Sequence, residues 1–282
     1  MAIIQVNETL LYYEDTGGSG APILFSHGLL WDTTLFAPQV AAFQGRYRCI
    51  AYDHRGQGKS ADGTGHAIDM ETLAADAAAL IETLRLGPVH FCGLSMGGFI
   101  AMRLAASRPD LIRSLILLET SADPESFKNV LKYRMLNLIA RFFSVRLVAH
   151  VVMPVMFGKS AIADPTRTAE RLAWRGQLIA NRRSIWRAVN GVIKRKGVYD
   201  KLATIAAPTL VIVGDEDVAT VPAKAERIAR AIKGAKLICI PYAGHSATVE
   251  QPEAVTAAIA AFLDEVSANG QPVRAAASQH SL

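Results

Sequence analysis

Short apolar runs alternate with amphipathic segments over much of the chain. The runs Pro22 to Ser26, Tyr47 to Tyr52 and Pro88 to Gly93 have the length of buried strands. Between them, Leu35 to Phe43 and Asp69 to Arg85 carry apolar residues at helical spacing. Strands that alternate with helices predict an α/β fold with a mostly parallel, doubly wound sheet and helices on both faces.

The same pattern extends to both ends of the chain. The segments IIQVN and LLYYED near the N-terminus predict a hairpin of two strands. Further strands are expected at Ser114 to Glu119, Thr209 to Gly214 and Ala235 to Pro241. Further helices are expected at Met96 to Ser107, Pro222 to Lys233 and Pro252 to Val266.

The alternation stops between residues 124 and 199, where helical stripes occur without a convincing strand. The candidate helices span 125–141, 143–153, 165–180 and 182–195. A helical insertion between two halves of a sheet is typical of a cap over that sheet. The predicted organisation is a core of residues 1–123 and 200–266, a helical cap of 124–199 and a disordered tail of 267–282.

Composition narrows the class of protein. With 51% hydrophobic and 20% charged residues, the 282-residue chain can bury a large core and is not disordered. An uncharged apolar run long enough to cross a membrane and a secretory signal are both missing from the sequence. The spacing of Cys49, Cys92 and Cys239 fits neither a metal site nor a disulfide framework. These features predict reduced cysteines buried in the core and a cytoplasmic protein.

Charge is unevenly spread along the chain. Between Glu125 and Asp200 there are fifteen Lys or Arg residues against four acids, a net +11, whereas the whole chain carries +5. Three interpretations stay open: a solvated basic surface, attraction of anionic substrates, or attraction to an anionic membrane surface. Since the sequence has no zinc-finger, helix-turn-helix or RNA-binding signature, nucleic acid is not an expected partner.

The strongest chemical signal is the segment from Gly93 to Gly98, which fits the G-x-S-x-G pattern around Ser95. It follows a predicted strand and precedes a predicted helix, which is where this nucleophile turn must lie. Glycines are needed at 93 and 97 because a side chain at either position would collide across the tight turn. The pattern therefore predicts Ser95 as a nucleophile.

A serine hydroxyl needs a base, and the hydrolase order places an acid and then a histidine downstream. His245 lies after the last predicted strand and just before the last helix. Asp217 comes three residues after Gly214, at the end of an earlier strand, and is the expected acid. Its neighbours Asp215 and Glu216 are rivals, and Glu119 at another strand end is a geometric alternative.

The oxyanion of an acyl-transfer reaction needs backbone N–H donors near the nucleophile. One is expected from Met96, directly after Ser95, and the other from Leu29, after the strand that ends at Ser26. Within the cap, apolar and aromatic side chains indicate either packing on the core or a substrate pocket. The expected pocket residues are Trp31, Phe143, Met156 and Trp186.

The chain resembles the α/β-hydrolase superfamily over nearly all of residues 1–266. The resemblance is carried by His27-Gly28, by Asp53 to Ser60, by Gly93 to Gly98 and by the segments around Asp217 and His245. SHGLLWDTTLFAPQ followed by YDHRGQGKS is most similar to the 3-oxoadipate enol-lactonase and carboxylesterase branch. The resemblance implies a catalytic triad, no cofactor and no metal.

The function expected from these features is hydrolysis of a small-molecule carboxylic ester or lactone through an acyl-enzyme intermediate. Alternatives are a perhydrolase or haloperoxidase-like activity, an acyltransferase or a C–C bond hydrolase with the same triad, or a ligand-binding member without catalysis. Perhydrolases of the fold often carry proline where Leu30 stands here. Epoxide hydrolases and haloalkane dehalogenases use a carboxylate at the position of Ser95, which argues against both.

Overall fold

The computed structural model describes residues 1–270 of the chain. In these residues the strands form an eight-stranded sheet with the order β1-β2-β4-β3-β5-β6-β7-β8. The pairings of β2 with β1 and with β4 are antiparallel, and the remaining strand pairs are parallel. The mostly parallel sheet predicted from the sequence is confirmed.

The strands lie close to the predicted apolar runs. Their bounds are β1 (Ala2–Val6), β2 (Thr9–Asp15), β3 (Pro22–Ser26), β4 (Arg48–Tyr52), β5 (Val89–Leu94), β6 (Ile112–Leu118), β7 (Thr209–Gly214) and β8 (Lys236–Ile240). Every residue of β5 and β7 is buried, as expected for central parallel strands covered on both faces.

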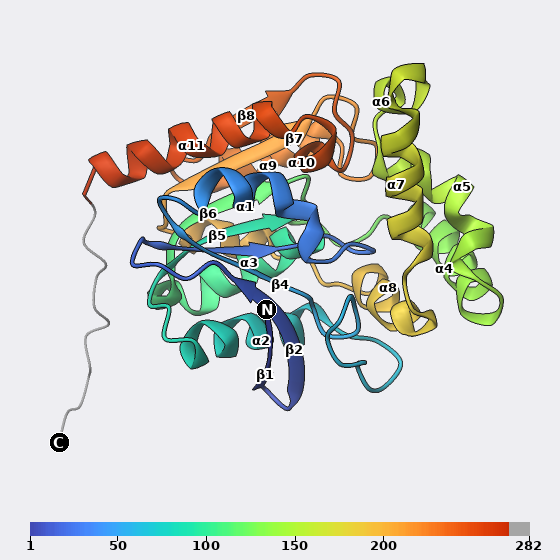
Figure 1. The fold of residues 1–282 in the computed structure, drawn as a ribbon, viewed down its shortest axis with the longest axis horizontal. Helices are drawn as coiled ribbons and strands as arrows, with labels where there is room; N and C mark the ends of the chain where they lie inside the picture. Colours follow the sequence, from blue (N-terminus) through green and yellow to red (C-terminus); the bar gives the residue numbers. More distant parts are fainter. Residues whose placement is uncertain (271–282) are drawn as a thin grey trace.

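Helices cover both faces of this sheet, which confirms the doubly wound arrangement (Figure 1). One layer holds α1 (Ala37–Phe43) and α11 (Pro252–Ala268), and the other holds α2 (Met70–Thr83), α3 (Met96–Ser107) and α9 (Pro222–Ala231). Successive strand residues point to opposite layers. In β3, Leu24 packs with α2 and α3, whereas Ile23 and Phe25 pack with α1 and α11.

Between β6 and β7 the chain forms helices that lie together beyond one end of the strands (Figure 1). They are α4 (Phe127–Phe142), α5 (Val145–Met156), α6 (Lys159–Ala163), α7 (Thr168–Ile179) and α8 (Trp186–Ile193). We refer to residues 124–199 as the cap. Pro154 lies inside the last turn of α5, so this helix extends beyond the predicted end at 153. The five-residue α6 was not predicted because it is too short to show a helical period.

Shorter elements complete the described chain. They are the 3-10 helices η1 (Thr33–Phe36), η2 (Pro109–Leu111), η3 (Pro165–Arg167), η4 (Arg183–Ile185) and η5 (Tyr199–Thr204), and the single turn α10 (Ala247–Glu250). None of the helices within residues 1–270 is both long and apolar enough to span a bilayer.

Two details differ from the sequence-based expectations. α11 continues to Ala268, so residues 267 and 268 are helical rather than part of a tail. Residues 271–282 of the expected tail lie outside the described residues. Cys49 and Cys92 are buried, but Cys239 is exposed because it belongs to β8, the last strand at one edge of the sheet.

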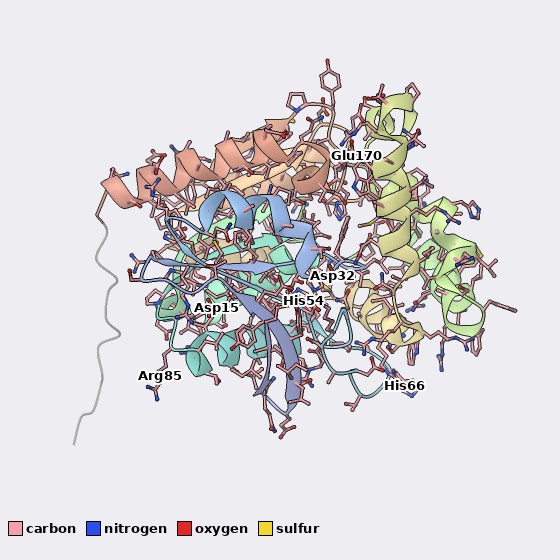
Figure 2. All side chains as sticks on the ribbon, viewed as in Figure 1. Asp15, Asp32, His54, His66, Arg85 and Glu170 are labelled. Carbon is pink, nitrogen blue, oxygen red and sulfur yellow. The ribbon has the colours of Figure 1, made fainter. Side chains whose placement is uncertain are left out.

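Polar contacts join the cap to loops at the carboxyl ends of the strands. Asp32, labelled in Figure 2 beside the cap, accepts a 2.8 Å hydrogen bond from the side chain of Gln177 in α7. Arg182 donates to the carbonyl oxygen of Ser60 at 2.7 Å. Ser184 donates to the carboxylate of Asp62, also at 2.7 Å. These contacts hold the cap over the end of the sheet that carries the predicted site.

Candidate active site

Ser95 occupies a strained turn between β5 and α3. Its backbone has φ of 52° and ψ of −108°, a conformation that residues other than glycine rarely adopt. A Cβ at Gly93 would collide with the backbone of Gly97, and one at Gly97 would collide with the carbonyl oxygen of Ser26. Gly93 is therefore needed across the turn, as inferred from the sequence, whereas Gly97 is needed because the turn lies close against the end of β3. The Ser95 N–H donates to the carbonyl oxygen of Leu118 at 2.8 Å, which holds the turn against β6.

Ser95, His245 and Asp217 form a hydrogen-bonded line. The Ser95 Oγ lies 2.8 Å from His245 Nε2, and His245 Nδ1 lies 2.8 Å from Asp217 Oδ2. All three residues are buried, although they come from three separate loops at the carboxyl ends of β5, β8 and β7. In this geometry the imidazole can take the hydroxyl proton while the carboxylate holds the ring in orientation.

The carboxylate of Asp217 is held by its own loop. Its Oδ1 accepts hydrogen bonds from the N–H groups of Ala219 and Thr220, and its Oδ2 accepts one from the Thr220 hydroxyl at 2.8 Å. Burial alone would raise the pKa of Asp217, but His245 and these donors hold it well below its ordinary value. Asp217 therefore stays ionised beside the imidazole. Thr220, which the sequence analysis did not identify, is part of this support.

Glu119, the alternative acid, does not contact His245. It is fully buried with φ of 46°, and both of its carboxyl oxygens accept from the N–H of Gly214, at 3.1 and 3.0 Å. Burial and the neighbouring charge of Asp217 raise the pKa of Glu119 well above its ordinary value. Burial beside the Asp217 carboxylate therefore favours the neutral, protonated form of this group.

Leu29 and Met96, whose N–H groups are the expected oxyanion donors, lie in the loop after β3 and at the start of α3. The loop that carries Leu29 is held in an unusual conformation, since Leu30 has φ of 70°. The buried side chain of Gln57 accepts a hydrogen bond from the Leu30 N–H at 3.0 Å and donates to Met96 Sδ at 3.7 Å. Gln57 therefore links the two segments that carry the expected oxyanion donors.

Two buried histidines lie beneath the same loop. His27 Nε2 accepts a 3.1 Å hydrogen bond from the N–H of His54, and His54 Nε2 lies 3.1 Å from the carbonyl oxygen of His27. Burial lowers the pKa of both rings, so each is neutral. Neither ring hydrogen-bonds Ser95, whereas His245 does.

Glu250 ties the loop of His245 to the cap. Its buried carboxylate accepts from the N–H groups of Gly244 and Ser246 on either side of His245, at 3.0 and 3.1 Å. It also accepts from the N–H of Gly158 in the cap, at 2.7 Å. This residue was not found from the sequence, because it lies in a helix with no motif of its own.

An apolar cavity of about 140 Å³ opens onto Ser95 and His245. Its far wall comes from the cap, and among the four expected pocket residues it includes Met156. The other three do not line it. Trp31 is buried against Phe157, Phe143 is 70% exposed on the outside of the cap, and Trp186 packs under the guanidinium of Arg141. Apolar residues lie on several faces of the cap helices, so their spacing alone did not indicate which face meets the cavity.

Polar groups stand at the cap side of the cavity. Arg195 is buried and pairs with Glu125 at 2.8 Å, while its Nε has no hydrogen-bond partner within the described residues. The buried Oδ1 of Asn137 also has no partner there, although its Nδ2 donates to Asn190. Both residues line the cavity. These unpaired atoms mark the cap side of the cavity as the part of its wall with unused hydrogen-bonding capacity.

Comparison with a family model agrees with this architecture. The model described as "Alpha/beta hydrolase family" matches residues 23–258. Among curated proteins, the chain is 30% identical over 262 residues to a putative non-heme bromoperoxidase from Mycobacterium tuberculosis. That match covers 92% of this chain and 99% of the relative.

Solved structures give the same result. A thermophilic esterase from Thermogutta terrifontis superposes with a TM-score of 0.87 at 31% identity, covering 94% of this chain and 99% of the esterase. The enol-lactonase from Burkholderia xenovorans LB400 gives a TM-score of 0.86 at 28% identity, covering 93% of this chain and 100% of the lactonase. The three matches are to proteins with three different names on a shared fold, so the reaction must be argued from the site.

Proposed function

Since the chain belongs to the alpha/beta hydrolase family, we propose that it is a serine hydrolase that cleaves a carboxylic ester or lactone. The observation that carries this proposal is the hydrogen-bonded line from Ser95 through His245 to Asp217 at the mouth of an apolar cavity. Lactonase and esterase are also the names of the two structural relatives described above.

The reaction follows from the roles that this geometry allows. The Ser95 Oγ attacks the substrate carbonyl carbon while His245 takes its proton. The N–H groups of Leu29 and Met96 stabilise the oxyanion, and His245 returns the proton to the departing alcohol oxygen. Water, deprotonated by His245, then hydrolyses the acyl-enzyme and releases the acid. For a lactone the departing oxygen stays attached to the acyl chain, so one product leaves.

The cavity supports an apolar group with a polar end as the substrate feature. A volume of about 140 Å³ is close to that of a cavity that takes up benzene, which is about 150 Å³. Because Glu125 already balances the charge of Arg195, the free Nε suits a neutral acceptor such as a hydroxyl or carbonyl oxygen. A panel of aryl esters with increasing acyl length, with and without a terminal hydroxyl, tests this preference.

Labelling and mutation of Ser95 test the proposal itself. An organophosphate should label the protein once, and Ser95→Ala should abolish labelling and reduce ester turnover by at least about a thousandfold. Ser107→Ala, in the last turn of the same helix α3, is the matched control and should keep both properties. Normal turnover by Ser95→Ala would refute the assignment.

Perhydrolysis is a second candidate, because the relative at 30% identity is named as a putative bromoperoxidase. Hydrogen peroxide would replace water as the nucleophile that attacks the acyl-enzyme, giving a peracid and free Ser95. Incubation with acetic acid and peroxide, followed by detection of peracetic acid, distinguishes the two reactions. Ester hydrolysis that greatly exceeds peracid formation would favour the first.

A further inference from the structure

The outward side of α4 carries a row of large apolar side chains. Phe127, Leu131, Met135, Leu138 and Phe142 are between 53% and 87% exposed. At 100° per residue they fall within an arc of about 80° around the helix axis. The row therefore forms one continuous strip along the helix rather than a scatter of single exposed residues.

The strip continues onto the start of α5. Phe143 and Leu147 are 70% and 56% exposed, and Figure 1 shows α4 and α5 at the outer edge of the molecule. We call these seven residues of α4, α5 and the turn between them the outer cap strip. A contiguous exposed apolar surface of this kind marks a contact surface in a soluble protein.

Basic residues border the strip on both sides. On the helical wheel of α4, Lys128 and Lys132 follow one edge of the apolar arc, and Arg134 and Arg141 follow the other. Arg146 lies at the start of α5. Within residues 1–270, none of these five side chains forms an ion pair. The sequence of α4 itself contains no acidic residue, so the border is uniformly positive.

We propose that the outer cap strip docks on the surface of an anionic phospholipid bilayer. The apolar arc would enter the boundary between headgroups and acyl chains, with the helix lying parallel to the membrane plane. Lys and Arg at both edges have long apolar stems that let their charged ends reach the lipid phosphates. The apolar strip therefore suits the acyl-chain boundary of such a surface, and the cations on both sides of it suit the anionic headgroups.

Charge argues against a second copy of the chain as the occupant. In a two-fold symmetric contact the same patch faces itself, so the basic borders of one copy would lie against those of the other. No acidic residue of α4 is available to balance them. An anionic partner removes this repulsion, and a like-charged one creates it.

The opposite side of α4 lines the cavity of the candidate site. Tyr133, Leu136, Asn137 and Ala140 contribute to the cavity wall. A single helix, about 10 Å across, therefore separates the cavity from the docked surface. The docking proposal itself does not depend on which reaction the cavity supports.

Vesicle sedimentation with the full chain tests the proposal. The protein should sediment with phosphatidylcholine vesicles that contain phosphatidylglycerol, and at least about tenfold less with phosphatidylcholine alone. Raising the salt concentration should release it, since the basic border acts through screened charges.

Paired variants separate the apolar and the charged contributions. Leu131→Ser with Met135→Ser should weaken binding to anionic vesicles at least about tenfold without altering charge. Lys128→Glu with Lys132→Glu should weaken it by a similar factor. The matched control is Lys201→Glu with Lys233→Glu. It makes the same charge change at two exposed positions outside the cap and should weaken binding much less. Circular dichroism of each variant confirms that it is folded.

Three results would overturn the proposal. They are absence of wild-type binding to either vesicle, equal weakening by the control pair, and a dimer in sedimentation velocity that the Leu131 and Met135 changes dissociate. The last would assign the strip to contact between copies. Because vesicle binding involves no turnover, each of these results leaves the serine-hydrolase proposal to its own test at Ser95.

Discussion

At the scale of single residues, two neighbouring buried carboxyl groups have pKa values that shift in opposite directions. Although burial opposes it, His245 and hydrogen-bond donors lower the pKa of Asp217, whereas burial and the charge of Asp217 raise the pKa of Glu119. Only Asp217 contacts His245. Mutation of the two residues should therefore affect turnover to different extents.

We expect Asp217→Asn to reduce kcat by about three to four orders of magnitude. The amide would favour the wrong tautomer of His245 and could not stabilise its cation. Glu119→Gln, which keeps a neutral donor at that site, should reduce kcat much less. Steady-state kinetics of both variants on one ester checks this, and a severe Glu119→Gln with a mild Asp217→Asn would assign the acid to β6 instead of β7.

Glu119 should also affect how stability depends on pH. Its pKa is raised in the folded state, so above the unfolded pKa of about 4.3 the folded chain binds a proton that the unfolded chain has lost. The free energy of unfolding then falls as pH rises towards the folded pKa, by at most about 1.4 kcal/mol per pH unit from this group.

Glu119→Gln removes this contribution, so the variant should gain stability relative to the wild type as pH rises from 5 to 8. Urea unfolding across that range measures the difference. The exposed Glu253→Gln is the control and should follow the wild-type profile. A Glu119→Gln curve parallel to the wild type would mean that Glu119 ionises normally.

At the scale of elements, the conformation of the loop after β3 is supported by the side chain of Gln57, which comes from the loop after β4. Gln57 accepts from Leu30 and donates to Met96, so it joins the two segments that carry the proposed oxyanion donors. We expect Gln57→Leu to lower kcat about tenfold or more with little change in KM, because the oxyanion forms in the transition state.

Kinetics at several ester concentrations separates the two parameters. Gln5→Leu on the exposed strand β1 makes the same substitution far from the site and should leave both unchanged. A change confined to KM would show that Gln57 acts on substrate binding, and its positioning role would then be wrong.

The features that could be predicted from the sequence are those that depend on residues close together in the chain. The turn at Ser95 and the strand ends before Asp217 and His245 are local patterns, and the structure brings those three side chains together. Gln57 and Glu250 act through contacts with distant segments, which no local spacing indicates. Thr220 supports Asp217 from the same loop, but no motif marks it. The wall of the cavity was the least predictable, because α4 carries apolar residues both inward and outward.

At the scale of the whole molecule, the uneven charge should influence which substrates arrive fastest. Residues 125–200, which cover nearly all of the cap, carry a net +11 from fifteen basic and four acidic residues, against +5 for the chain. We expect kcat/KM for an anionic ester to fall as salt rises, while that for a neutral ester of similar shape changes little. The reason is that the Debye length shrinks from about 10 Å at 0.1 M to about 3 Å at 1 M.

The ratio of the two rate constants across a salt series is the measurement. Comparison of the two esters cancels any general effect of salt on the enzyme. A constant ratio would mean that the cap charge plays no part in substrate capture and that its basic side chains only face solvent or a partner surface.

The carboxylate of Glu250 has a consequence for exchanging caps between members of the family. It joins Gly158 of the cap to the loop of His245, and a Cβ at Gly158 would come within 2.9 Å of the Gly244 nitrogen. A transplanted cap therefore needs a glycine with a free N–H at this junction, whatever pocket it brings. Two chimeras with the same cavity can be joined just before or just after residue 158, so that one keeps Gly158 and the other takes the residue of the transplanted cap. We expect them to differ in activity, because only the chimera with glycine at 158 preserves the contact of Glu250 that holds the loop of His245.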